Sequence, residues 1–105
     1  MSHKNLEPKM FGLSDRQYRI LCDGLSSIKE HKLFVFGSRA RGDHKEYSDI
    51  DILVDGEPDP RTLSQVKELL EESSLLIKVD LVLKKDLLQD YAASVERDRK
   101  EFHFV

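Results

Sequence analysis

The feature that most constrains the fold is a run of alternating acidic and aliphatic residues from Asp49 to Val54. Successive side chains of a β-strand point to opposite faces, so Asp49 and Asp51 would share one face of a sheet, and Ile50, Ile52 and Val54 the other. Two neighbouring carboxylates repel each other, which is costly unless a cation lies between them. The run therefore predicts a sheet with one apolar face and one acidic, cation-binding face.

A third acid, Asp80, interrupts the strongly β-forming run from Leu76 to Leu83. If that run forms the strand beside Asp49 and Asp51, the three carboxylates converge. Mg²⁺ takes hard oxygen ligands and binds one or two carboxylates together with substrate phosphates. A cluster of three acids can hold two metal ions about 3.5–4 Å apart, which stabilises both the attacking and the leaving oxygen of a phosphoryl transfer.

Upstream of the acids, the apolar run from Leu33 to Phe36 predicts a short buried strand that ends at Gly37. Gly37 and Ser38 stand where a following helix would begin, and the free backbone N–H groups of a helix start favour a phosphate. The pair is also suited to capping that helix, and the two roles use the same donors. The segment is not a Walker loop, because the Gly-Lys-Ser/Thr ending is absent.

These segments together resemble the polymerase-beta-like nucleotidyltransferases, and within them the minimal nucleotidyltransferases. The pattern of that family is Gly-Ser, a spacer, Asp-x-Asp, and a later lone Asp on a neighbouring strand. In this chain the matching residues are Gly37-Ser38, then ten spacer residues, Asp49-x-Asp51, and Asp80. The resemblance extends over nearly the whole chain.

The resemblance implies a magnesium-dependent nucleotidyltransferase, and more narrowly an adenylyltransferase, in which a hydroxyl attacks the α-phosphorus of ATP and pyrophosphate leaves. Asp49 and Asp51 would bridge two Mg²⁺ ions, for which Mn²⁺ could substitute. Asp80 would hold the catalytic ion and help to remove the proton of the hydroxyl. Gly37 and Ser38 would cradle the β and γ phosphates.

Two arginines in the spacer leave alternatives open. Arg39 and Arg41 could each neutralise a triphosphate, or one of them could pair with Asp43 or Glu46. The resemblance favours Arg41 for the nucleotide, because Arg41 occupies the recurrent Arg-Gly position. For His44, in the same spacer, a plain loop position is the preferred interpretation.

Minimal nucleotidyltransferases commonly resemble the antitoxins of two-gene toxin-antitoxin systems. In those systems the other gene product, the partner of the antitoxin, is a helical HEPN ribonuclease. The resemblance therefore implies a HEPN-type toxin as partner, or a homo-oligomer, and an acceptor hydroxyl on a protein or RNA. The competing hypothesis is a non-catalytic module that neutralises a partner toxin by direct contact. The presence of all three acids favours the enzyme.

Charge and length narrow the class of protein further. The 17 Lys and Arg against 20 Asp and Glu give a net charge of −3, which argues against a protein that coats nucleic acid. No apolar stretch approaches the ~20 residues of a membrane span, and the single cysteine, Cys22, fits a reducing compartment. We therefore expect a cytoplasmic protein with one domain over residues 1–105, of which 1–11 form a flexible segment.

The remaining patterns predict three helices around the strands. Helical spacing and caps indicate one over 14–31, one from Asp59-Pro60 to about Ser73, and one capped by Asp86. The inner face of the third would consist of Leu87, Leu88, Tyr91, Ala92 and Val95. Strand, helix, strand in that order implies a parallel pair. We expect an α/β (α+β) two-layer domain with a mixed sheet, helices on one face, and the polymerase-beta-like nucleotidyltransferase fold.

Once these strands, helices and the spacer are counted, little of the chain remains to form a further domain that would bind the base and the acceptor. The acidic face is therefore expected to stay open until a partner or a second copy closes it. The apolar residues from Phe102 to Val105 either fold back as an edge strand or contact a partner, and folding back is the preferred interpretation.

Overall fold

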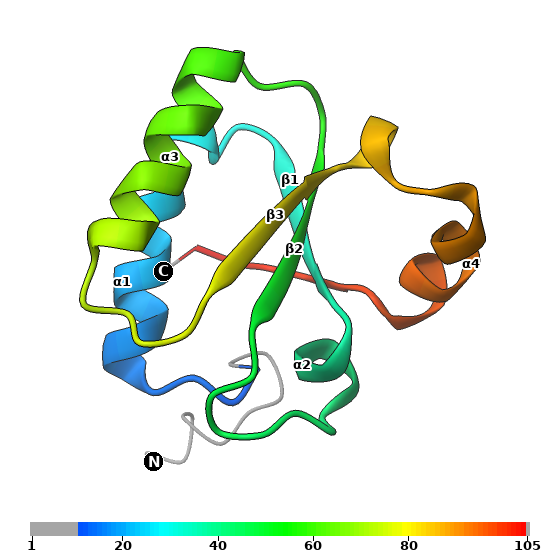
Figure 1. The fold of residues 1–105 in the computed structure, drawn as a ribbon, viewed down its shortest axis with the longest axis horizontal. Helices are drawn as coiled ribbons and strands as arrows, with labels where there is room; N and C mark the ends of the chain where they lie inside the picture. Colours follow the sequence, from blue (N-terminus) through cyan, green and yellow to red (C-terminus); the bar gives the residue numbers. More distant parts are fainter. Residues whose placement is uncertain (1–10, 105) are drawn as a thin grey trace.

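The centre of the molecule is a four-stranded sheet with the order β3-β2-β1-β4 (Figure 1). The computed structural model describes residues 11–104. The strands are β1 (Lys32–Phe36), β2 (Ile50–Asp55), β3 (Val79–Leu83) and β4 (Lys100–Glu101). Strand β1 runs antiparallel to β2 and β4, whereas β2 and β3 are parallel. The mixed sheet and the parallel pair expected from the sequence are confirmed.

Two helices, α1 (Asp15–Leu25) and α3 (Pro60–Glu72), lie side by side against one face of this sheet (Figure 1). The core lies between them and the sheet. Its most deeply buried side chains belong to Leu21, Leu25, Ile28, Leu33, Val35, Ile50, Ile52, Val54 and Val66. Ile50, Ile52 and Val54 of the acidic run thus face the helices, as the alternation predicts, whereas Leu53 is buried outside this core cluster.

Both helices begin at the caps that the sequence indicates. At the start of α1 the backbone N–H of Gln17 donates to Oγ of Ser14 at 3.1 Å, and the N–H of Ser14 donates to Oε1 of Gln17 at 2.9 Å. At the start of α3 the carboxylate of Asp59 accepts from the N–H of Arg61 at 2.8 Å. These bonds satisfy N–H groups that have no partner within a helix.

The first helix is shorter than the predicted span of 14–31. It ends at Leu25, and a 3-10 turn, η3 (Ser26–Ile28), follows. The hydroxyl of Ser26 donates to the carbonyl oxygen of Asp23 at 3.0 Å, a local bond that competes with helix continuation. Ile28 is nevertheless fully buried, which explains why its spacing looked helical.

The last helix, α4 (Gln89–Asp98), lies on the opposite side of the sheet from α1 and α3 (Figure 1). Asp86 does not cap it, because residues Lys84–Asp86 form a 3-10 turn, η4, and the chain is extended at Leu87 and Leu88. The predicted inner face is therefore wrong in part, since Val95 is buried but Leu88 and Tyr91 are 65% and 58% exposed.

The C-terminal segment folds back onto the sheet, as preferred from the sequence. Strand β4 pairs with β1, and the N–H of Phe102 donates to the carbonyl oxygen of Leu33 at 2.8 Å. The ring of Phe102 stacks on Tyr18 with centroids 4.9 Å apart, and the Tyr18 hydroxyl donates to the carbonyl oxygen of His103 at 2.7 Å. Val105 lies outside the described residues.

The segment 1–11, expected to be flexible, lies outside the described residues except for Phe11. The side chain of Phe11 is buried in the core. None of the helices between residues 11 and 104 has the length and apolar character needed to cross a bilayer.

Candidate active site

The parallel pairing of β2 and β3 brings Asp51 and Asp80 together. The two residues are direct partners in the register of the strands, and the N–H of Ile50 donates to the carbonyl oxygen of Lys78 at 2.9 Å just before them. Both acids line one cavity of about 500 Å³. Asp49, immediately before β2, is exposed and does not line this cavity.

The electrostatics of the acids follow from this arrangement. Asp51 is half-buried, whereas Asp49 and Asp80 are exposed. Burial raises the pKa of the Asp51 carboxyl, and the negative charges of Asp80 and Asp49 raise that pKa further. Asp49 and Asp80 are thus close enough to disfavour the charge of Asp51, and a cation near Asp51 would relieve that repulsion.

The donor set suits a hard divalent cation, because every member is a carboxylate. Among residues 11–104, however, no three or more His, Cys, Asp or Glu side chains are already arranged around a metal position. Asp51 and Asp80 would hold a cation from the two strands, and phosphate oxygens of a substrate would complete its coordination. That division of ligands between protein and phosphates is the one Mg²⁺ usually shows.

The backbone of Gly37, directly after β1, packs closely against the side chain of Asp51. Its backbone has φ 77° and ψ −154°, a conformation that is essentially restricted to glycine. A Cβ built at this position would lie 2.6 Å from Oδ2 of Asp51. The absence of a side chain at residue 37 therefore allows both the turn and the packing of the backbone against the carboxylate.

The turn at Gly37 leads into α2 (Ser38–Arg41), a single helical turn. The N–H groups of Ala40 and Arg41 both donate to the carbonyl oxygen of Gly37 at 3.1 Å. A helix thus begins where the sequence indicates one. Gly37 lines the acidic cavity, whereas Ser38 is half-buried beside it and is not one of the lining residues.

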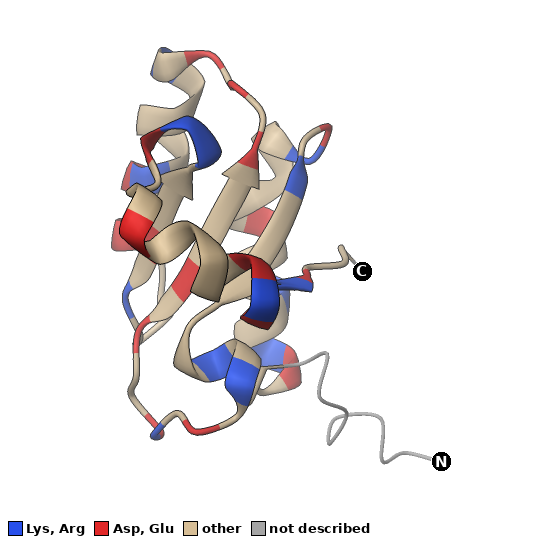
Figure 2. Ribbon diagram, turned by 90° about the vertical axis from the view of Figure 1, so that its right-hand side faces the viewer, with Lys and Arg blue, Asp and Glu red and all other residues tan. Residues whose placement is uncertain are grey.

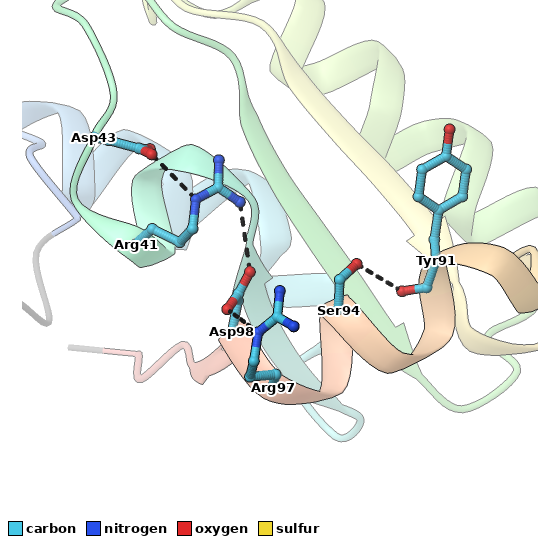
Figure 3. A network of polar contacts seen from close by, with 6 residues as sticks. All are labelled: Arg41, Asp43, Tyr91, Ser94, Arg97 and Asp98. Atoms are coloured by element: carbon cyan, nitrogen blue, oxygen red, sulfur yellow. Dashed lines mark hydrogen bonds and ion pairs between the residues drawn. The ribbon is translucent and has the colours of Figure 1, made fainter.

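Arg41 lies at the edge of the acidic cavity and is held by two carboxylates (Figure 3). Its Nε donates to Asp43 at 3.2 Å, and a terminal nitrogen lies 3.5 Å from Oδ2 of Asp98 at the end of α4. Nε of Arg97 lies 3.2 Å from the other oxygen of Asp98. The hydrogen bond from Arg97, assisted by the one from Arg41, lowers the pKa of Asp98 despite partial desolvation.

Arg39 occupies a different environment. Its side chain is only 3% exposed, and its guanidinium donates to three backbone carbonyl oxygens, those of Phe11, Glu46 and Ser48, at 2.9–3.1 Å. It is not among the residues that line the acidic cavity. Of the two arginines, the structure therefore brings only Arg41 to the acids, and Arg39 fixes the path of the spacer.

Helix α4 supplies a wall of the cavity that the sequence did not indicate. Lining residues from the segment around this helix are Asp86, Leu87, Leu88, Tyr91, Ser94, Val95 and Asp98. Viewed from the side of α4, acidic residues are visible on this helix and on the strands behind it (Figure 2). The expectation of an open acidic face is therefore wrong in part, because α4 lines one side of the cavity while Asp49 and Asp80 remain exposed. Helical spacing of apolar residues does not distinguish a core from a cavity wall, so the sequence held no clear signal for this role.

The fold and this site define the class of protein. Residues 16–103 match the family described as the nucleotidyltransferase domain, and the chain belongs to that family. The resemblance to the minimal nucleotidyltransferases, and with it the expectation of a nucleotidyltransferase enzyme, is confirmed.

Individual relatives agree with this assignment. The chain is 47% identical over 66 residues to the protein adenylyltransferase MntA of Thermococcus cleftensis, an alignment that covers 61% of this chain and 66% of that relative. It is 42% identical over 74 residues to the putative protein adenylyltransferase MJ1379 of Methanocaldococcus jannaschii, covering 67% of this chain and 74% of that one. The aligned part thus spans roughly two thirds to three quarters of these relatives.

A solved structure shares the fold. The crystal structure of a toxin-antitoxin with AMP-PNP superposes with a TM-score of 0.58 at 22% sequence identity, covering 80% of this chain and 73% of that chain. The two chains therefore share the arrangement of sheet and helices.

Proposed function

We propose that this protein transfers the AMP group of ATP to a hydroxyl group on a protein partner, with Mg²⁺ as the cofactor. The observation that carries the proposal is the pairing of Asp51 with Asp80 in a cavity that also contains Gly37 and Arg41. The names of the relatives, which are protein adenylyltransferases, support ATP as the donor and a protein as the acceptor.

In the proposed reaction the acceptor oxygen forms a bond to the α-phosphorus, and the bond from that phosphorus to the pyrophosphate oxygen breaks. Asp49, Asp51 and Asp80 would hold two Mg²⁺ ions, which when bound would neutralise charge that develops on the phosphates. Asp80 is exposed at the cavity and would take the proton of the hydroxyl.

The phosphates would lie at the end of the cavity formed by Gly37 and Arg41. The backbone N–H groups at Gly37 and Ser38 are suited to donate to the β and γ phosphates. Asp43 and Asp98 hold the guanidinium of Arg41 at the cavity edge, so that it would neutralise the triphosphate from a fixed position. Arg39 has no part in this site, because its donors are bonded to backbone carbonyl groups.

We further propose that the partner is the toxin of a two-gene pair, of the HEPN type, and that this chain is its antitoxin. The toxin-antitoxin structure with the same fold supports such a partner. A module that acts by contact alone is less well supported, because it would need neither the glycine at position 37 nor the paired acids.

The test is incubation of the protein with Mg²⁺, α-labelled ATP and the product of the neighbouring gene. We expect label on that product. Asp80→Asn should retain ATP binding but reduce transfer by about 10²-fold or more, because proton removal by a positioned base contributes on that order. Asp90→Asn is a matched control, since Asp90 is an exposed acid of α4 that does not line the cavity.

Two outcomes would contradict the proposal. One is inhibition of the partner with no label on it, which would favour neutralisation by contact. The other is an Asp80→Asn protein that transfers label at the wild-type rate.

A further inference from the structure

The acidic cavity has two chemically different ends. One end carries Gly37, Arg41, Asp51 and Asp80, and the proposed function assigns it to the phosphates and the reacting atoms. The other end is formed by β3 and the segment that leads into α4. Its lining residues Val82, Leu87, Leu88, Tyr91 and Val95 are apolar or aromatic, and Asp86, directly before Leu87, is the charged one among them. No role in the proposed reaction accounts for this second end.

The two ends lie along α4. Arg41 contacts Asp98 at the C-terminal end of the helix, whereas Tyr91 extends from the first turn (Figure 3). Residues 91 and 98 are seven positions apart, which corresponds to about 10 Å along a helix axis. An extended nucleoside triphosphate spans a distance of this order, so one molecule could occupy both ends.

Tyr91 is available to a ligand. Its side chain is 58% exposed although it lines the cavity, and its hydroxyl makes no hydrogen bond within residues 11–104. The hydroxyl of Ser94 donates to the backbone carbonyl oxygen of Tyr91 at 3.0 Å and so supports the turn that carries the ring. Leu88, one turn earlier, is 65% exposed beside it.

We propose that this apolar end binds the nucleobase, with the ring of Tyr91 as the surface on which the base stacks. Nucleobases stack on aromatic side chains because both present flat π faces. A purine offers a larger face than a pyrimidine, so the class of substrate is a purine nucleoside triphosphate. This inference rests on the proposed function, since the triphosphate must lie at the Gly37 and Arg41 end.

The test is calorimetric titration of ATP, CTP and inorganic tripolyphosphate, each with Mg²⁺, into four proteins. These are the wild type, Tyr91→Ala, Tyr91→Phe and the control Tyr47→Ala. Tyr47 is 67% exposed and lies outside the acidic cavity, so its replacement removes an equally exposed ring from another surface.

The wild type should bind ATP more tightly than CTP. Tyr91→Ala should raise the Kd for ATP about tenfold, the loss expected for one stacked base, and should leave the Kd for tripolyphosphate unchanged. Tyr91→Phe retains the ring and should bind ATP like the wild type, as should Tyr47→Ala.

Equal affinity of Tyr91→Ala and wild type for ATP would overturn the inference and leave the proposed function intact. If Tyr91→Ala bound ATP like the wild type but no longer bound the protein partner, Tyr91 would belong to a docking surface on α4 and not to a base site. An equal loss of ATP and tripolyphosphate binding in Tyr91→Ala would also overturn it, because the ring would then act on the phosphate end. A wild type that binds neither ligand would overturn both this inference and the proposed function.

Discussion

Replacement of Gly37 by alanine should weaken the fold and the reaction through the same carboxylate. The backbone at residue 37 has φ 77° and ψ −154°, and a residue with a side chain in that region costs about 1–3 kcal/mol. The added Cβ would lie 2.6 Å from Oδ2 of Asp51, so the carboxylate must leave its rotamer, at about 0.5–1.5 kcal/mol. We therefore expect a loss of about 2–4 kcal/mol in the free energy of unfolding.

Urea denaturation measures this loss. For a slope of about 2 kcal/mol per molar urea, the midpoint should fall by about 1–2 M. The variant should still fold, because small domains have about 5–15 kcal/mol of stability. Its transfer rate should fall by about 10²-fold, the effect of displacing a reacting group by roughly 1 Å.

Gly42→Ala is the matched control. Gly42 also has a positive φ, 95°, but no heavy atom lies within 4 Å of a Cβ built there. It should show the backbone cost alone, about 1–2 kcal/mol, with transfer retained. An unchanged urea midpoint in Gly37→Ala would refute the reasoning, and so would an equal loss of transfer in both variants.

Three further predictions concern charge, metal and the C-terminal segment. Because burial and the two neighbouring acids raise the pKa of Asp51 above 3.8, its ionised form is disfavoured in the folded state, and stability should fall as the pH rises through that raised pKa. Asp51→Asn should remove this fall and be at least as stable at neutral pH, which urea midpoints across a pH series would check. Mg²⁺ or Mn²⁺ with ATP should raise the melting temperature, by the equivalent of about 2.7 kcal/mol at a hundredfold excess over Kd. An Asp49→Asn/Asp51→Asn protein that showed the same rise would exclude this cation site. Tyr18→Phe removes the 2.7 Å bond to His103 but keeps the stacked ring, and should cost about 0.5–1.5 kcal/mol, whereas an unchanged unfolding midpoint would show that the bond contributes nothing.

The sheet could be predicted from the sequence because its signals are local. The alternation from Asp49 to Val54 places the acids on one face, and a helix between two strands implies the parallel pair that brings Asp51 beside Asp80. The helix caps at Ser14 and Asp59 depend only on residues up to three positions away. Features of this kind need no knowledge of the tertiary structure.

The wall formed by α4 could not be predicted in the same way. Leu88, Tyr91 and Val95 have a spacing that fits a helix packed on a core, and the same spacing fits a helix beside a cavity. Whether the helix packs on the core or lines a cavity depends on the path of the chain after β3. The role of Arg39 depends likewise on tertiary contacts, since its partners are backbone carbonyl groups, including one that lies 28 positions away.

The bonds of Arg39 also limit how the chain can change in length. The guanidinium at the start of the spacer holds the carbonyl groups of Glu46 and Ser48 near its end, directly before Asp49. An insertion between them would have to bulge outward without stretching those bonds, or it would displace Asp49. Among the described residues, no side chain hydrogen-bonds to the backbone of the segment from Gly56 to Pro58, which lies outside the acidic cavity. Pro58 is buried, whereas Glu57 is exposed and lies 3.9 Å from Lys85. Homologues and engineered variants should therefore tolerate added residues in that turn, while the spacer keeps a length set by the reach of one arginine side chain.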